Sequence, residues 1–441
     1  MKNKLYIIFA LFISVLMLNT VKAESILTYE ETYNFSRTDY VENIISLKDN
    51  LFLISSYNII KTSNEYEYIT DKYFEDLNTV NGIKYNDNIM LVGIENNVLK
   101  AYLLDENLQV IKQQETSYII DSYVTIKLYS YEDKVYVMLL SNETLSNNNI
   151  YEISSELTIT EKSLSSYDSS LLKKILKGDY YLIRMNDIEE NNRITHYYST
   201  AYNKDYTILV GDTSNVTYNE TNGYEYKGNI TILDSNGEVV SKIETDEHYS
   251  FEDVELISDK IIVITNDNPN SYLLVYNING TLEEKIDITH DVEGFPMQAM
   301  KLFKDNSKLT IFSYEYSKAR YHYKTFMVYN FDYSVITNEN VLGTVNVPTN
   351  AKTNDLVTIE ITPNSGYEID SVEVVDSLGN PITLSDTYSF IMPDSDVYVT
   401  VNYKIKVDNP ETVDIVTIIG ISAIIALFLG FKITGKLRWL K

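Results

Sequence analysis

The 441-residue chain contains no cysteine, one tryptophan and only four histidines. Without cysteine it has no disulfide framework, no thiolate nucleophile and no cysteine-ligated zinc site. The histidines stand singly along the chain, at His196, His248, His290 and His322, so the paired-histidine motif H-E-x-x-H is absent. No phosphate-binding loop of the G-x-x-x-x-G-K-[ST] kind occurs either. These absences argue against the common thiol, zinc and nucleotide chemistries.

Basic residues are also scarce, with 36 Lys and Arg against 63 Asp and Glu and a formal net charge of -27. Because nucleic-acid binding needs clustered Lys and Arg, we expect no nucleic-acid partner. We expect no bound cofactor, and at most weak, screened association with Ca²⁺, because no complete loop of oxygen ligands is visible. The segment 234–238 resembles part of such a loop but lacks its distal glutamate, and a type I′ hairpin turn is the better interpretation.

The first 23 residues have the pattern of a secretory signal peptide. Lys2 and Lys4 precede an uncharged apolar run over residues 5–18, which is too short to span a bilayer together with its flanks. Val21 and Ala23 then occupy the small-residue positions of a cleavage site. The pattern predicts export and cleavage after Ala23.

The other end of the chain predicts a membrane anchor. Residues 415–431 carry no charge and predict one transmembrane helix. The tail over residues 432–441 has no acidic residue and four basic ones: Lys432, Lys436, Arg438 and Lys441. Because such tails stay in the cytoplasm, the sequence predicts a single-pass protein whose N-terminal part lies outside the cell.

A short motif lies in the linker 407–414, immediately before the predicted span: Asn409, Pro410, Glu411, Thr412 and Val413. Motif, span and basic tail together resemble the wall-sorting signals of Gram-positive surface proteins, of the L-P-x-T-G and N-P-x-T-G kind. Asn409, Pro410 and Thr412 match, whereas Val413 stands where the family has glycine. The resemblance implies a sortase as partner and attachment to the cell wall through Thr412. Retention by the membrane span is the alternative.

Residues 24–341 show an all-β texture, with short apolar runs bounded by Asn, Asp, Ser and Gly and no convincing helical period. The densest runs predict strands covered on both faces, and they begin at Asp49, Asp87, Asp133, Asp179, Asp259 and Ser307. Candidate hairpin tips recur about every 43 residues, the length of a four-stranded propeller blade, and lie at Asp71, Asp105, Ser155, Asn203, Asp234, Asn277 and Asn330.

The repeat length predicts a β-propeller of six or seven blades over residues 24–341. The strand-like segment 26–34, which precedes the first repeat, is expected to close the ring by joining the last blade. A pair of stacked β-sandwiches is the alternative architecture.

Residues 342–406 form a separate pattern. Apolar residues alternate at Val357, Ile359 and Ile361, and again over residues 397–401, which predicts half-buried strands. A Thr-Pro...Gly-Tyr turn follows the first strand and a Phe-x-Met-Pro element at Phe390 precedes the last. The segment resembles the divergent internalin-type B repeat, a small all-β module of bacterial surface proteins. The resemblance implies a spacer or interaction module without catalysis.

Together these features predict a non-catalytic binding or adhesion protein at the cell surface, with an extracellular glycan or protein as ligand and no catalytic residues assigned. The alternative is a surface-tethered glycan hydrolase or lyase that uses propeller carboxylates. Acid pairs such as Glu189-Glu190 and Glu283-Glu284 are frequent enough to keep that alternative open.

Overall fold

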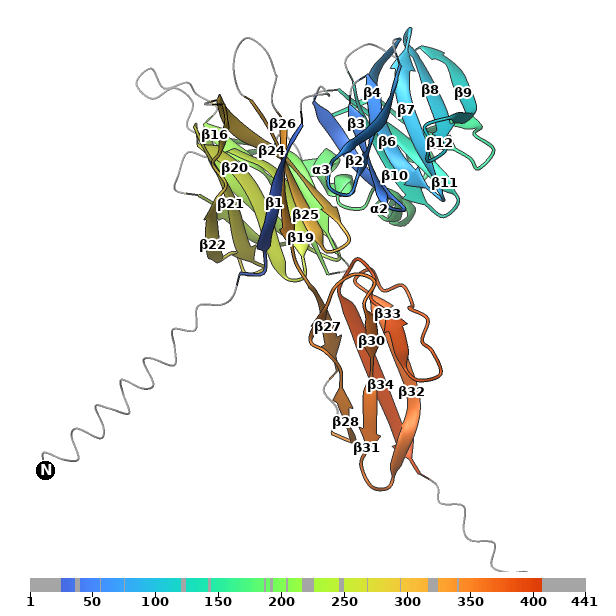
Figure 1. Ribbon diagram of the computed structural model, residues 1–441, viewed down its shortest axis with the longest axis vertical. Coiled ribbons are helices and arrows are strands. Elements are labelled where there is room, and N and C mark those ends of the chain that lie inside the picture. The colour runs from blue at the N-terminus through green and yellow to red at the C-terminus, as the bar shows by residue number, and fades with distance from the viewer. Residues whose placement is uncertain are drawn as a thin grey trace, which may run out of the picture.

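The computed structural model describes residues 25–406, except for 36–39, 56, 75, 120–123, 142–143, 186–187, 191–192, 204, 216–225, 246–249, 268, 294, 316–323 and 339–340. The described residues form a body of twisted β-sheets with an elongated β-module attached to one end (Figure 1). The all-β prediction is confirmed, apart from a short helical insertion.

The main body consists, within the described residues, of six antiparallel sheets that we number as blades 1 to 6 in chain order. Blade 1 contains β2 (Val41–Leu47), β3 (Asn50–Ser55), β4 (Asn58–Ser63) and β5 (Tyr68–Tyr73). Blade 2 contains β6 (Leu77–Tyr85), β7 (Asn88–Glu95), β8 (Val98–Leu104) and β9 (Val110–Ile119). Blade 3 contains β10 (Thr125–Tyr131), β11 (Lys134–Ser141), β12 (Thr144–Ile153) and β13 (Ile159–Ser163).

The remaining blades follow the same meander, with short additions. Blade 4 contains β14 (Ile188–Glu190), β15 (Arg193–Tyr202), β16 (Tyr206–Asn215), β17 (Tyr226–Asp234) and β18 (Val239–Glu244). Blade 5 contains β19 (Ser250–Ile257), β20 (Lys260–Asp267), β21 (Asn270–Asn277) and β22 (Leu282–Asp287). Blade 6 contains β23 (Asp291–Val292), β24 (Phe295–Asp305), β25 (Lys308–Glu315), β26 (Lys324–Asn330) and β1 (Thr28–Phe35).

Strand β1 closes the ring, because it pairs antiparallel with β26 although it precedes blade 1 in the chain. The expectation that segment 26–34 joins the last blade is therefore confirmed. Buried apolar side chains also fill the space between blades 6 and 1, including Phe312 and Phe326 on one side and Leu53 and Ile60 on the other. Shared apolar cores also join blades 1 and 2, blades 2 and 3, blades 4 and 5, and blades 5 and 6. Between blades 3 and 4, apolar side chains of residues 171–185 fill the space. This ring is the arrangement of a propeller and not of stacked sandwiches.

The described residues form six blades, one of the two predicted numbers, although the sequence predicts seven hairpin tips. Two of them, Asn203 and Asp234, lie on the same blade, at the β15–β16 and β17–β18 turns. Asn330 is the last residue of β26 and Asp71 lies within β5, so neither is a hairpin tip. Blade 6 has no outer hairpin because its outermost strand is β1.

The expected strand beginning at Asp179 is wrong, because residues 179–185 form a helix. Between blades 3 and 4 lie a short 3₁₀ helix η1 (Leu164–Ser166), α2 (Ser169–Leu176) and α3 (Asp179–Met185). Asp168 caps α2 by accepting a hydrogen bond from Leu171 N. Gly178 lies between the two helices and close to blade 4. A Cβ atom at this position would lie 2.0 Å from Thr200 Oγ1 of blade 4, so only glycine fits there.

Polar side chains on the innermost strands link neighbouring blades. Asn43 Nδ2 of blade 1 donates to Gly82 O of blade 2 at 2.9 Å, and Asn81 Nδ2 of blade 2 donates to Ile126 O of blade 3 at 2.8 Å. Asn43 lies beside a register shift in its strand, where an irregular ladder frees groups for such contacts.

The same links continue on the other side of the ring. Asp253 of blade 5 accepts from Ser199 of blade 4 and, at 2.8 Å, from Leu302 N of blade 6. Lys301 of blade 6 in turn donates to Glu42 of blade 1. The links hold the inner strands, and hence any site built on them, in a fixed geometry.

The C-terminal module contains β27 (Tyr333–Thr337), β28 (Gly343–Asn346), β29 (Asn350–Ala351), β30 (Leu356–Thr358), β31 (Glu360–Pro363), β32 (Tyr367–Asp376), β33 (Ser389–Ile391) and β34 (Val397–Ile405). Its largest sheet has the order β29-β27-β34-β32, with β27 parallel to β34. Strand β27 therefore belongs to the module, although it lies before the boundary placed at residue 342. The strands on either side of Asn330, expected to form one hairpin, are divided between blade 6 and the module.

The module is fixed to blades 5 and 6 by a shared core and a buried carboxylate. Phe390 and Val397 of the module belong to the same apolar cluster as Ile257 and Leu302 of the propeller. Asp396, only 6% exposed, accepts from Ser334 N and Ser258 Oγ, both at 2.8 Å. The module thus continues the propeller core.

Candidate functional site

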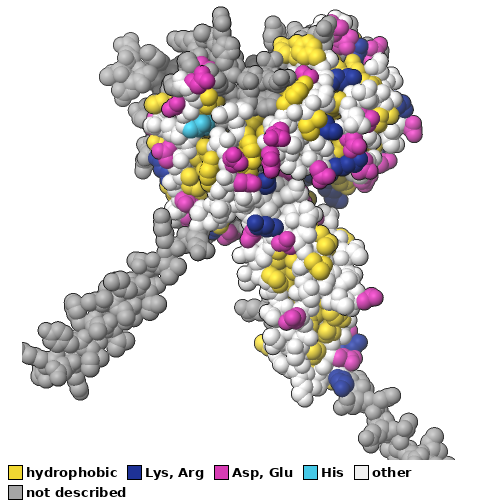
Figure 2. Space-filling model, viewed as in Figure 1, with side chains coloured by type: hydrophobic (Ala, Val, Ile, Leu, Met, Phe, Trp, Pro, Cys, Tyr) yellow, Lys and Arg dark blue, Asp and Glu magenta, His cyan; other side chains and the backbone are white. Residues whose placement is uncertain are grey.

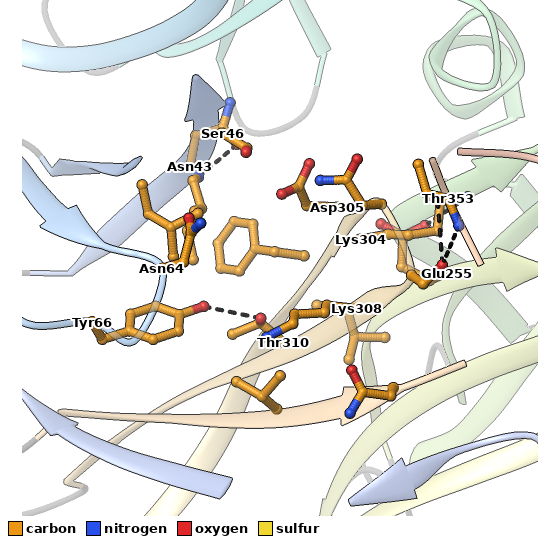
Figure 3. A pocket seen from close by; sticks show the side chains of 18 of the residues that line it. Asn43, Ser46, Asn64, Tyr66, Glu255, Lys304, Asp305, Lys308, Thr310 and Thr353 are labelled. Atoms are coloured by element: carbon orange, nitrogen blue, oxygen red, sulfur yellow. Dashed lines mark hydrogen bonds and ion pairs between the residues drawn. The ribbon is translucent and has the colours of Figure 1, made fainter. Parts of the chain in front are cut away.

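A cavity of about 790 Å³ forms a groove between blades 6 and 1 on the side that carries the module. We call it the module-side groove. Figure 3 shows Asn64 and Tyr66 of blade 1 facing Lys304, Asp305 and Thr310 of blade 6, with Glu255 and Thr353 at the far end. The groove therefore joins blades 1, 5 and 6 with the module.

One wall of the groove is rigid and aromatic. Tyr66 is 7% exposed, stacks on Phe326 with ring centroids 4.5 Å apart, and forms a 2.9 Å hydrogen bond with Thr310 Oγ1. Burial raises the pKa of the Tyr66 hydroxyl above its ordinary value. The hydroxyl therefore stays neutral and ties blade 1 to blade 6.

The module supplies part of the groove through residues 352–354. Thr353 N donates to Ser307 Oγ at 2.8 Å, which holds this loop against blade 6. The exposed Lys352 also lines the groove, and no described residue accepts a hydrogen bond from its ammonium group. A bound molecule would therefore meet a positive charge at this edge.

Amide side chains give the groove free hydrogen-bonding capacity. Asn64, Asn330 and Asn354 line it, and their side-chain amides have no hydrogen-bond partner among the described residues. Asn43, by contrast, is already engaged in the link between blades 1 and 2. Each free amide offers two donors and an acceptor, which suits hydroxyl-rich ligands.

An unusual carboxyl group lines the inner end of the groove. Burial raises the pKa of Glu255 to about 7, although Lys304 Nζ lies 3.9 Å from its carboxylate. Burial also raises the pKa of Asp305. Glu255 therefore titrates near neutral pH, in the range of general acids and bases.

A second group of acids lies on blades 4 and 5. Asp212 is 3% exposed and its Oδ2 accepts from Tyr198 Oη at 2.6 Å and from Ser250 Oγ at 3.4 Å. Its Oδ1 is buried and has no hydrogen-bond partner in the part of the chain that the structure describes. Burial, with Asp212 and Asp253 nearby, raises the pKa of Glu252 to about 7. Burial also raises the pKa of Asp212.

The acid pairs noted in the sequence do not form these clusters. Glu283 and Glu284 lie on β22, the outermost strand of blade 5, where Glu283 pairs with Lys260 at 3.1 Å. Glu189 and Glu190 lie on the short strand β14. No local pattern distinguishes Glu255 and Glu252 from the other acids of the sequence, because only the ring buries them.

Asp234 has a structural role that explains its turn. Its Oδ1 accepts from Asn236 N and Glu238 N, both at 2.9 Å, and Gly237 follows with φ +88. Gly237 N also donates to Asp234 O, which makes a four-residue turn followed by a bulge and not the expected type I′ turn. Backbone hydrogen bonds lower the pKa of Asp234. Among the described residues no group of three or more acids or histidines is arranged to hold a metal ion.

Two histidines lie in the described part of the chain. His290 bridges Ile288 O, at 3.0 Å, and Thr325 Oγ1, at 2.7 Å, through its two ring nitrogens, which is a structural role. His196 lies on β15, beside Asp212 of β16. His248 and His322 lie outside the described residues.

The residues assigned to export and anchoring also lie outside the described part: Ala23, Asn409, Pro410, Thr412, Lys432, Lys436, Arg438 and Lys441, together with the span 415–431. Within residues 25–406, as far as they are described, no helix is long and apolar enough to cross a membrane. The surface itself is acidic in character: Figure 2 shows Asp and Glu side chains spread over the propeller face and, more sparsely, the module.

A comparison with family models matches residues 333–407 to the divergent InlB B-repeat domain. The match begins at Tyr333, the first residue of β27, in agreement with the sheet that β27 joins. The resemblance noted for residues 342–406 is thereby confirmed. No curated protein matches the chain.

Solved structures similar to the chain include propellers. The WD40 domain of Neurospora crassa Pan2 is 9% identical with a TM-score of 0.32, covering 66% of this chain and 75% of that one. The Dos1 propeller is 10% identical with a TM-score of 0.30, covering 69% and 78%. The polysaccharide lyase Uly1 is 12% identical with a TM-score of 0.32, covering 61% and 62%. The propeller assignment rests on the chain's own sheets and cores.

Proposed function

We propose that the protein is a bacterial cell-surface binding protein whose propeller holds a glycan in the module-side groove. The free amides of Asn64, Asn330 and Asn354 carry the proposal, because they present unused donors and acceptors in one cavity. A B-repeat module after the propeller supports display at a surface, where it acts as a spacer.

Binding is tested with purified protein on an array of host and wall glycans, followed by calorimetry on each glycan retained. The double variant Asn64→Ala/Asn330→Ala removes two of the free amides. We expect it to weaken binding roughly tenfold or more, since each lost hydrogen bond contributes about 1 kcal/mol. The matched control is Asn107→Ala on an exposed turn of blade 2, which should bind like the parent. Equal affinity of the double variant and the parent would overturn the groove assignment.

A second candidate function is glycan cleavage, and Glu255 is the observation that favours it. A carboxyl group with a pKa of about 7 can serve as a general acid or base at neutral pH. The test incubates the retained glycans with the protein and detects shorter products by mass spectrometry. Shorter products that form with the parent protein and not with the Glu255→Gln variant would support cleavage. If the parent protein leaves the glycans intact, the cleavage function is ruled out and only the binding function stands.

We propose that export follows the leader ending at Ala23 and that the C-terminal region holds the protein at the surface. Because proline disfavours a helical conformation of the residue before it, Pro410 favours an extended Asn409, which supports access of a sortase to the motif. Mass spectrometry of protein released from the surface decides between the two anchors. A C-terminal peptide ending at Thr412 and joined to a wall fragment supports transfer, whereas detergent-extracted protein that retains Trp439 supports the membrane span.

A further inference from the structure

A second cavity, of about 570 Å³, lies between blades 3 and 4, whereas the module-side groove lies between blades 6 and 1. Helices α2 and α3, turns of blades 3 and 4, and a turn of the module at Leu378 and Asn380 surround it. We call it the basic pocket. It shares no lining residue with the module-side groove.

The charge of the basic pocket is opposite to that of the chain. Lys173, Lys174 and Lys177 line it, against one acid, Glu132. The chain as a whole has 63 acidic residues and only 36 basic ones. No described acid forms an ion pair with any of these three lysines. Their position at the end of α2 complements the helix dipole, but that interaction leaves their ammonium hydrogens available.

Aromatic rings hold two of the lysines in place. Lys173 Nζ lies 5.3 Å from the Tyr181 ring centroid and donates to Asn236 O at 3.2 Å. Lys177 Nζ lies 5.4 Å from the Tyr202 ring centroid. Cation–π contact restricts these long side chains, so less conformational entropy is lost when they bind a ligand. Lys174 is exposed and extends the positive edge outward.

The pocket also offers partly exposed tyrosine rings. Tyr131, Tyr181, Tyr202 and Tyr206 all line it and none is fully buried. Tyrosine combines a flat apolar face with a hydroxyl group, which suits a sugar ring with its apolar face and polar edge. The lysines alone would fit any anion, whereas the rings select an anion attached to a ring system.

We propose that the basic pocket binds an acidic sugar residue, with its carboxylate, sulfate or phosphate group on the lysines and its ring against the tyrosines. The acidic remainder of the protein repels densely charged polymers such as nucleic acids, so a glycan with sparse acidic groups fits best. The module contributes to the pocket, so the complete chain is needed for binding.

The test uses the full-length protein and three hexasaccharide probes in calorimetry: one with uronate residues, one with sulfate groups and one neutral. We expect binding of at least one acidic probe and no binding of the neutral probe. The uronate and sulfate arms distinguish the source of the negative charge. Equal binding of neutral and acidic probes, or no binding of any probe, would overturn the proposal.

Variants with opposite expected effects sharpen the test. Lys174→Gln removes one exposed positive charge and should weaken binding roughly tenfold. Glu132→Gln removes the single lining acid and should strengthen binding several-fold. The matched control Lys72→Gln lies on the edge strand β5 of blade 1 and should leave affinity unchanged. A stronger effect of Lys72→Gln than of Lys174→Gln, or weaker binding by Glu132→Gln, would contradict the assignment.

Discussion

Glu255 predicts a pH dependence of stability that one substitution can isolate. Its folded-state pKa is about 7, raised from an ordinary value of 4.5 chiefly by burial. The folded protein therefore holds this proton more tightly than the unfolded chain does. Between about pH 4.5 and pH 7 the folded state binds more protons, so the free energy of unfolding falls as pH rises through this window. Below and above it, this group adds no pH dependence.

The magnitude follows from the pKa difference. At about 1.4 kcal/mol per pKa unit the upper limit is about 3 kcal/mol. The side chain is 23% exposed, and solvent reduces the effect, so we expect about 1 to 3 kcal/mol. In the Glu255→Gln variant the side chain at this position cannot ionise. Relative to the parent, the variant should therefore gain this amount of stability between pH 4 and pH 8.

Urea denaturation followed by circular dichroism at several pH values measures the difference. The control Glu156→Gln changes the same formal charge at a side chain that is 85% exposed, so its difference from the parent lacks the contribution of burial. A difference between Glu255→Gln and the parent that is constant from pH 4 to pH 8 would refute the burial argument.

Three further predictions concern the architecture. Asp396→Ala leaves Ser334 N and Ser258 Oγ without their acceptor and should destabilise the module junction by about 1 to 3 kcal/mol. We expect faster proteolytic release of the module, and an unchanged release rate would contradict the docking role of Asp396. Phe390→Ala opens a cavity at a side chain that is 2% exposed and should cost about 3 to 5 kcal/mol in calorimetry, whereas a loss below 1 kcal/mol would mean that the core relaxes around it. Deleting residues 28–35 leaves β26 as an open edge, so the melting temperature should fall and aggregation should rise; an unchanged melting temperature would show that β1 does not stabilise the ring.

The local pattern was sufficient where a feature depends on neighbouring residues. Turn residues at Asp105, Asp234 and Asn277 marked hairpins because their side chains bond backbone amides two and four residues later. Alternating valines over residues 397–401 predict a half-buried strand, because successive side chains of a strand point to opposite faces. The structure buries these valines. The B-repeat resemblance is also a local pattern, and its match is confirmed.

The helix at Asp179 shows where the local pattern was insufficient. Tyrosine and isoleucine favour strands, so the run after Asp179 by itself predicts a strand. In the folded chain Asp179 accepts hydrogen bonds from Lys127 and Tyr129 of blade 3, while Leu182 is buried against blade 4. Packing between two blades therefore outweighs the intrinsic preference, and no local rule contains that information.

The candidate sites were decided by tertiary structure alone. Glu255, Tyr66 and Thr353 come from blade 5, blade 1 and the module, and they line one groove only because β1 closes the ring and the module docks on blades 5 and 6. The sequence by itself determined the strand-rich texture, the turns and the acidic charge, since these depend on residue type and short spacing. The raised pKa of Glu255 and the free amides of the groove depend on burial and on contacts across the ring, which exist only once the fold has formed.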